Sequence, residues 1–78
     1  MTNTEKRVAV CFSNVFPDLR DDEISRASTI SLASWDSVAH VTLLSSIAEE
    51  FGQQFELEDF DELVSYQLIV DRLGNTTP

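Results

Sequence analysis

Residues 36–52 read DSVAHVTLLSSIAEEFG, and this stretch decides the fold. Apolar side chains recur along it at the three- and four-residue spacing of one helix face. The members of this stripe are Val38, Val41, Leu44, Ile47 and Phe51. Gly52 follows the last of them, and glycine is the residue that most often ends a helix. We therefore predict a helix over residues 37–51, with a second face that carries His40, Ser45, Glu49 and Glu50.

Two more long helices are predicted, one on either side of this segment. Thr2 and Glu5 have the spacing of a capping box, and Pro17 ends the apolar periodicity that follows them. The periodic residues are Val8, Cys11, Phe12, Val15 and Phe16. Near the C-terminus, Ser65 is the predicted cap of a helix that runs to Gly74. Its apolar residues are Tyr66, Ile69, Val70 and Leu73.

The segments between the long helices are less regular. Residues 17–36 mix charged and small residues with isolated apolar ones, which predicts a long loop. Asp59 and Glu62 predict the cap of one short helix. The predicted fold class is therefore all-α: a four-helix bundle of three longer helices and one short helix, with a long loop between the first two.

Length and charge restrict what such a bundle can do. The 78 residues predict a single domain at residues 1–74 and a flexible C-terminal tail at 75–78. A chain this short does not hold both a stable core and a deep enclosed active site, so a carrier or binding role is expected rather than an enzyme. The net charge of −9 repels nucleic acid and anionic membranes. Residues 27–78 hold one basic and nine acidic groups, which favours basic partners.

The chain is expected to be a soluble cytoplasmic monomer. It has no N-terminal apolar run of signal-peptide length and no stretch of about 18 apolar residues that would span a membrane. Its single cysteine, Cys11, lies among apolar neighbours and predicts a buried thiol, in keeping with a reducing compartment. No metal site is expected, because the acidic loop from Asp18 has Glu23 and Thr29 where an EF-hand needs glycine and glutamate.

Ser37 stands at the start of the predicted helix of residues 37–51. The first N–H groups of a helix are unpaired and its dipole is positive there, so this position favours an attached anion such as a phosphodiester. Two other interpretations are open. Serine is a preferred N-cap, so Ser37 could serve only to cap the helix. His40 lies one turn away, which invites a nucleophile and base pair, but no glycine elbow, oxyanion loop or third partner accompanies it.

The order of these features resembles an acyl carrier protein over nearly the whole chain. A helix, a long loop, Asp36-Ser37-Val38 at the start of the second helix, Glu-Glu-Phe-Gly at its end, a short helix and a final helix follow one another. The resemblance implies that Ser37 carries a 4'-phosphopantetheine arm, derived from coenzyme A, whose thiol holds acyl groups as thioesters. It also implies that Asp36 assists attachment, by helping to bind the metal ion of a phosphopantetheinyl transferase. The protein would then be a shuttle in fatty-acid or polyketide-type biosynthesis.

The resemblance also implies which partners to expect: acyl-transferring and condensing enzymes with basic docking surfaces. The residues expected to contact them are Trp35, Val38, Glu49 and Glu50. The candidates for an acyl pocket are Val41, Leu44 and Ile47. Trp35 is also open to a second interpretation, in which it is a packing residue. Within the resemblance, a tryptophan directly before Asp36 favours a stand-alone carrier of polyketide or other specialised metabolism. The alternative function is a small acidic helical protein–protein interaction module in which Ser37 is only an N-cap.

Overall fold

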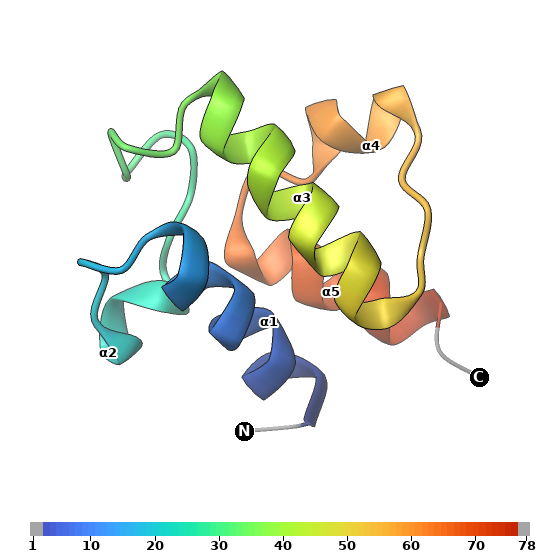
Figure 1. Cartoon of the computed structure of the whole chain (residues 1–78), viewed down its shortest axis with the longest axis horizontal. Helices are drawn as coiled ribbons and strands as arrows, with labels where there is room; N and C mark the ends of the chain where they lie inside the picture. The colour runs from blue at the N-terminus through green and yellow to red at the C-terminus, as the bar shows by residue number, and fades with distance from the viewer. Residues whose placement is uncertain (1–2, 77–78) are drawn as a thin grey trace.

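The computed structural model describes residues 3–76, which form five helices and no strand (Figure 1). The helices are α1 (Asn3–Val15), α2 (Asp21–Ile24), α3 (Ser37–Phe51), α4 (Leu57–Glu62) and α5 (Tyr66–Thr76). The predicted all-α class is confirmed. The predicted number of four helices is wrong, because α2 forms inside the segment expected to be a loop. None of the described helices is both long enough and apolar enough to cross a membrane.

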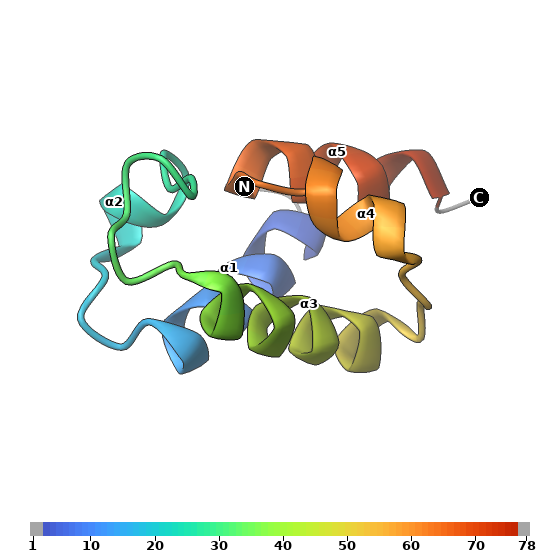
Figure 2. The ribbon, with the colours of Figure 1, turned by 90° about the horizontal axis from the view of Figure 1, so that it is seen from above.

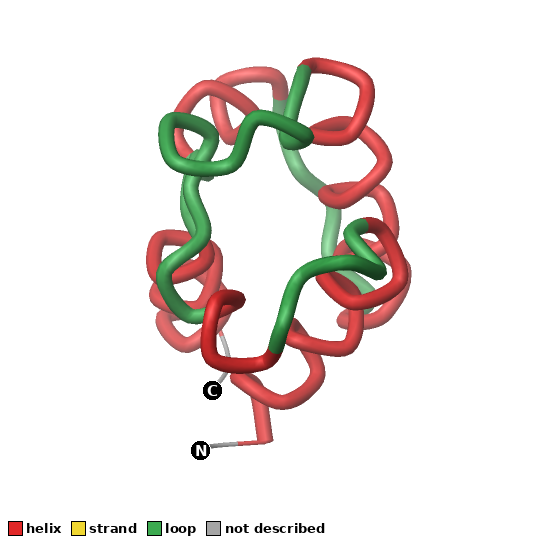
Figure 3. Tube along the Cα trace, turned by 90° about the vertical axis from the view of Figure 1, so that its left-hand side faces the viewer, coloured by secondary structure: helices red, strands yellow, loops and turns green. Residues whose placement is uncertain are grey.

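α1 connects the other parts of the fold. It packs against α2, α3 and α5, and α3 in turn contacts α4. Seen from above, α3 lies on one side of the molecule and α4 and α5 lie on the other, with α1 between them (Figure 2). The long segment between α1 and α3 lies at one end of this arrangement (Figure 3). The start of α3 lies at that same end (Figure 1).

The segment between α2 and α3 is held against the body of the fold. The backbone N–H of Tyr66 donates to the carbonyl of Ala27 at 3.0 Å, and that of Thr29 donates to the carbonyl of Val64 at 2.9 Å. Ala27 is itself buried. Backbone hydrogen bonds of this kind give a loop the fixed geometry of regular structure. They hold the residues before α3 close to the start of α5.

The core is built around aromatic rings. Phe12 of α1 packs edge-on against Trp35, with ring centroids 5.3 Å apart, and against Tyr66, with centroids 5.5 Å apart. Such edge-to-face contacts are favourable because the positive edge of one ring meets the negative face of the other. The buried aliphatic side chains around these rings are Val8, Ile24, Leu43, Leu44, Ile47, Leu63, Ile69 and Leu73. α1, α3 and α5 therefore supply most of the core.

The buried face of α3 differs from the predicted stripe. Leu44 and Ile47 are completely buried as expected, and Leu43 is buried beside them. Val38 and Val41, in contrast, are 76% and 51% exposed. An exposed Val38 is compatible with its predicted contact with partner enzymes, which stays a prediction. Val41 does not share the buried side of Leu44 and Ile47 as the predicted stripe implied, because the side of α3 that packs into the core carries Leu43, Leu44 and Ile47.

Three helix boundaries follow local chemistry. Gly52 has a φ of 62° directly after α3, a conformation that glycine adopts without strain, so the predicted stop is confirmed. The hydroxyl of Ser65 accepts the N–H of Leu68 at 3.1 Å, which confirms the predicted cap of α5. α4 begins before Asp59, not at it, because the Asp59 carboxylate closes the first turn by accepting the N–H of Glu56 at 2.8 Å.

The two ends of the chain lie partly outside the described residues. α5 continues through Gly74 to Thr76, so Gly74 does not end the helix as predicted; its φ is not positive, and glycine is tolerated within a helix. Residues 75–76 of the predicted tail are therefore helical. Residues 77–78 lie outside the described residues, as does Thr2 of the predicted capping box.

Candidate functional site

Ser37 is the first residue of α3, and its side chain is exposed. The residue that caps α3 is Asp36: its Oδ1 accepts the backbone N–H of Ala39 at 2.9 Å, and its carbonyl accepts the N–H of His40 at 2.8 Å. The interpretation of Ser37 as the N-cap is therefore wrong. Within residues 3–76, no hydrogen-bond partner engages the Ser37 hydroxyl.

Open space adjoins this hydroxyl. A pocket of about 230 Å³ is lined by Ser37, Asp36, Trp35 and His40, together with Thr29 of the preceding loop. The positive end of the α3 dipole lies at the same place, because the first N–H groups of the helix point toward its start. A group attached to Ser37 would therefore meet free volume and the positive end of the helix dipole, beside the carboxylate of Asp36.

His40 is not placed to act as a base for Ser37. Trp35 Nε1 donates to His40 Nδ1 at 2.9 Å, and His40 Nε2 lies 2.6 Å from the carbonyl oxygen of Phe60. An indole N–H only donates and a carbonyl only accepts, so Nδ1 is unprotonated and Nε2 carries the hydrogen. Because both ring nitrogens are engaged, neither is left to take a proton from Ser37.

The same contacts correct the expected position of His40. It was predicted on the outer face of the helix, but it is partly buried and lies against the core aromatic Trp35 and against Phe60 of α4. This Trp35–His40–Phe60 link joins the loop before α3, α3 itself and α4. Trp35 and His40 line the same pocket as Ser37, and the link holds the start of α3 in a defined orientation.

Trp35 belongs to the core rather than to the surface. Only 3% of the residue is exposed, and its ring packs against Phe12 and Phe16. The prediction that Trp35 contacts a partner is therefore wrong, since almost none of its side chain is accessible. Of the two interpretations left open, the packing residue is the one that the structure supports.

The residues predicted to line an acyl pocket are divided between core and solvent. Leu44 and Ile47 are completely buried, whereas Val41 is half exposed on the other side of α3. The acyl pocket was predicted because the three residues share one apolar stripe of the helix. In the structure α3 buries a different side, so Val41 does not line a common cavity with Leu44 and Ile47. Val41 instead joins Val38 on an uncharged exposed face that begins at Ser37.

Glu49 and Glu50 lie at the far end of α3. Glu49 stands twelve positions after Ser37 in α3, a rise of about 18 Å at 1.5 Å per residue. Glu50 is engaged within the chain: its Oε2 accepts Arg7 Nε at 2.8 Å, and its carbonyl accepts a second Arg7 N–H at 2.6 Å. The Arg7 guanidinium also lies over the Phe51 ring, 4.1 Å from its centroid. Neither glutamate is brought next to Ser37, and Glu50 has a structural role that the sequence did not indicate.

Among the described residues 3–76, three groups away from Ser37 have shifted pKa values. Burial raises the pKa of the Cys11 thiol, and the predicted burial of this residue is confirmed. The backbone N–H of Glu56 lowers the pKa of Asp59, and the Arg72 guanidinium at 2.7 Å lowers it further. Burial also raises the pKa of Tyr66. The Asp59–Arg72 pair joins α4 to α5 and was not foreseen, because the two residues lie in different predicted helices.

Comparison of the chain with known protein families, curated proteins and solved structures finds no match. No group of three or more His, Cys, Asp and Glu side chains within residues 3–76 is arranged to hold a metal ion. Function must therefore be inferred from Ser37 and its surroundings.

Proposed function

We propose that this protein is an acyl carrier, in which Ser37 bears a 4'-phosphopantetheine arm. The observation that supports this most directly is that an exposed serine begins α3 while its neighbour Asp36 supplies the cap. In a serine that serves only as a cap, the side-chain oxygen accepts the first-turn N–H groups. That place is taken here by the carboxylate of Asp36, so the Ser37 hydroxyl has no structural task among the described residues.

The surroundings of Ser37 suit an attached phosphodiester. The start of α3 supplies a positive dipole and unpaired N–H groups, and the adjoining pocket of about 230 Å³ supplies room. The Asp36 carboxylate next to it would repel a phosphate unless a cation neutralised both. One of its oxygens is engaged by Ala39, while the other has no hydrogen bond within residues 3–76 and is available to such a cation. This arrangement fits the role in attachment that the resemblance assigns to Asp36.

The arm would supply a thiol at the end of a flexible tether, which raises the effective concentration of a bound acyl group at any enzyme that docks the protein. The chain's own residues would keep the attachment point in place. Asp36 fixes the first turn of α3, and the Trp35–His40–Phe60 link fixes that turn against the core and α4. Ser37 is thereby presented outward from a rigid helix end.

Partner enzymes would dock on the exposed face of α3 next to Ser37. This face carries Val38, Val41, Thr42 and Ser45, and its first charge is Glu49. Apolar contact with the two valines would supply much of the affinity, because exposed aliphatic side chains gain free energy when an interface removes them from water. The acidic residues elsewhere on the chain would steer basic partners from a distance. We propose acyl-transferring and condensing enzymes of fatty-acid or polyketide-type biosynthesis as these partners.

The proposal is tested by incubating the purified chain with coenzyme A, magnesium and a broad-specificity phosphopantetheinyl transferase, followed by mass spectrometry. The wild type should gain the mass of one phosphopantetheine group, and Ser37→Ala should gain none. Ser34→Ala is the matched control, because Ser34 is an exposed serine three residues earlier, and it should be modified like the wild type. A folded wild-type chain that gains no mass would refute the carrier and favour the small acidic interaction module.

A further inference from the structure

His40 and Trp35 are the single histidine and the single tryptophan of the chain, and a hydrogen bond joins their side chains. The indole N–H donates to His40 Nδ1, and His40 Nε2 donates to the carbonyl of Phe60. Only the neutral imidazole can do both, because one of its nitrogens must accept while the other donates. Histidine is the side chain that ordinarily changes charge between about pH 5 and 8. The link between the loop before α3, α3 and α4 therefore depends on a side chain of the type that takes up a proton in this range.

The charged imidazole cannot make both contacts. Protonation places a hydrogen on Nδ1, and two N–H groups then face each other across the 2.9 Å that separates Trp35 Nε1 from His40 Nδ1. Turning the ring over exchanges its two nitrogens but does not help, because the imidazolium has two donors and no acceptor. The carbonyl of Phe60 remains an acceptor, whereas the indole N–H is left without one. Proton uptake therefore opposes the contact between Trp35 and His40.

Burial decides which of the two rings gives way. Trp35 is 3% exposed, and its ring packs against Phe12 and Phe16 of α1. His40 is only partly buried, and it lines the pocket of about 230 Å³ beside Ser37. A charged ring gains hydration when it moves toward solvent, whereas movement of the indole would disrupt the aromatic core. His40 is therefore the ring that leaves, and the pocket next to it offers the volume.

Three carboxylates belong to the segments that pack around His40. Asp36, directly before α3, lines the same pocket. On α4, Asp59 and Asp61 stand on either side of Phe60 in the sequence; the Asp59 carboxylate is bonded within the chain, and Asp61 is exposed. Within residues 3–76, no ion pair joins the imidazole to any of the three. A change of charge on His40 therefore breaks no ion pair.

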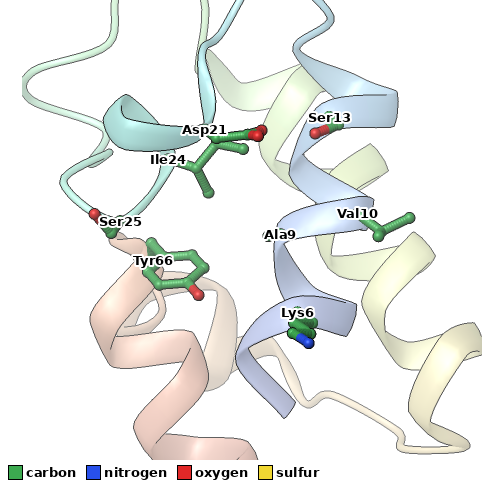
Figure 4. Close-up of a pocket in the computed structure, with 8 residues that line it drawn as sticks. All are labelled: Lys6, Ala9, Val10, Ser13, Asp21, Ile24, Ser25 and Tyr66. Atoms are coloured by element: carbon green, nitrogen blue, oxygen red, sulfur yellow. The ribbon is translucent and has the colours of Figure 1, made fainter. Parts of the chain in front are cut away.

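The contribution of α1 to this region is aromatic. Phe12 and Phe16 are the α1 residues that pack on the Trp35 ring, and neither carries a charge. Lys6 of α1 and Asp21 of α2 line a separate hollow between α1, α2 and the start of α5, which no residue of α3 borders (Figure 4). α1 therefore supports the link with rings rather than with a charge.

We propose that His40 is a pH-sensitive switch at the start of α3. When Nδ1 takes up a proton from solvent, the ring leaves Trp35 and the Phe60 carbonyl and turns into the pocket beside Ser37. Loss of the two hydrogen bonds frees the start of α3 from α4, and the charged ring occupies space next to the Ser37 hydroxyl. In the carrier, acid would thereby restrict access to the attachment point. This last consequence rests on the proposed function, whereas the switch itself does not.

The switch is tested on the unmodified chain by NMR between about pH 8 and 5. Three signals are followed: the ring nitrogens of His40, the indole N–H of Trp35 and the carbonyl carbon of Phe60. Nδ1 should be unprotonated at the upper pH. As it gains its proton, the Trp35 and Phe60 signals should shift with the same midpoint. Protonation of His40 that leaves the other two signals unchanged would overturn the proposal, as would a His40 that stays neutral over the whole range.

His40→Gln is the matched control, because the side-chain amide accepts and donates hydrogen bonds but takes up no proton in this range. The Trp35 and Phe60 signals of this variant should not shift together. Equal shifts in the variant and the wild type would assign the change to other groups and overturn the proposal. His40→Asn replaces His40→Gln if that variant does not fold by circular dichroism, and the shared midpoint in the wild type decides without either variant.

The consequence for Ser37 has its own readout. The rate of phosphopantetheine transfer to the wild type is divided by the rate to His40→Gln at each pH, which removes the pH dependence of the transferase. This ratio should fall as the pH is lowered through the midpoint of the NMR titration, and a constant ratio would overturn the effect on Ser37. If neither chain is modified at any pH, the carrier function is refuted, while the NMR titration still decides whether His40 is a switch.

Discussion

Replacing His40 by leucine tests the Trp35–His40–Phe60 link next to Ser37. Leucine fills similar volume, but it neither accepts the indole N–H of Trp35 nor donates to the carbonyl of Phe60. Both hydrogen bonds are short, at 2.9 and 2.6 Å, and the indole is almost completely buried. The variant therefore leaves a buried donor without a partner.

The expected loss of stability follows from these two bonds. A buried donor left unsatisfied costs about 1–3 kcal/mol, and a lost hydrogen bond to a partly exposed carbonyl costs about 1 kcal/mol. His40→Leu should therefore lower the free energy of unfolding by about 2–4 kcal/mol. For a domain of this size the corresponding fall in Tm is roughly 8–32 °C.

The assay is urea unfolding followed by circular dichroism, arranged as a double-mutant cycle with Trp35→Phe. Phenylalanine has no indole N–H, so His40→Leu should cost about 1 kcal/mol less in the Trp35→Phe background. Equal costs in the two backgrounds would refute the Trp35–His40 hydrogen bond. At a temperature where His40→Leu is folded, Ser37 should still accept phosphopantetheine, because His40 is not its base. Failure of modification in the folded variant would contradict that assignment.

Three further outcomes are expected. Asp36→Ala should lower the free energy of unfolding by about 1 kcal/mol through loss of the α3 cap, measured by urea unfolding; an unchanged value would contradict the capping role. Glu50→Lys should lower the free energy of unfolding by roughly 0.2–1 kcal/mol, because it breaks the ion pair with Arg7, in which the Glu50 side chain is 46% and the Arg7 side chain 40% exposed. The control Glu49→Lys should have the melting temperature of the wild type. Equal melting temperatures of the two variants would contradict this difference. Asp59→Asn should be destabilised at neutral pH. The folded pKa of Asp59 is lowered, so its stabilisation is present above the unfolded value of about 3.9 and is lost as the pH falls through the folded value. The difference in urea midpoint between Asp59→Asn and the wild type should therefore become smaller as the pH is lowered. The same difference at every pH would exclude a role for the Asp59 charge.

Local chemistry made several features predictable. α3 begins at Ser37 and ends before Gly52 because a cap residue and a left-handed glycine act within a few residues of the helix end. The start of α5 at the Ser65 cap and the end of α1 before Pro17 were predictable for the same reason, because each boundary depends on residues next to it in the chain. α2 was missed although its three acidic residues in sequence favour a helix start, because a four-residue turn leaves no apolar periodicity to detect.

The sequence by itself therefore determined where the main helices lie and that a serine begins α3. Only the tertiary structure decided which side of α3 is buried, because the periodicity fits a stripe through Val41 as well as one through His40 and Leu43. It also decided that Trp35 is a core residue and that Arg7 binds Glu50, 43 positions away. Capping and turn formation depend on neighbours along the chain, whereas burial depends on which helix faces meet, and one helix cannot specify the faces that other helices will cover.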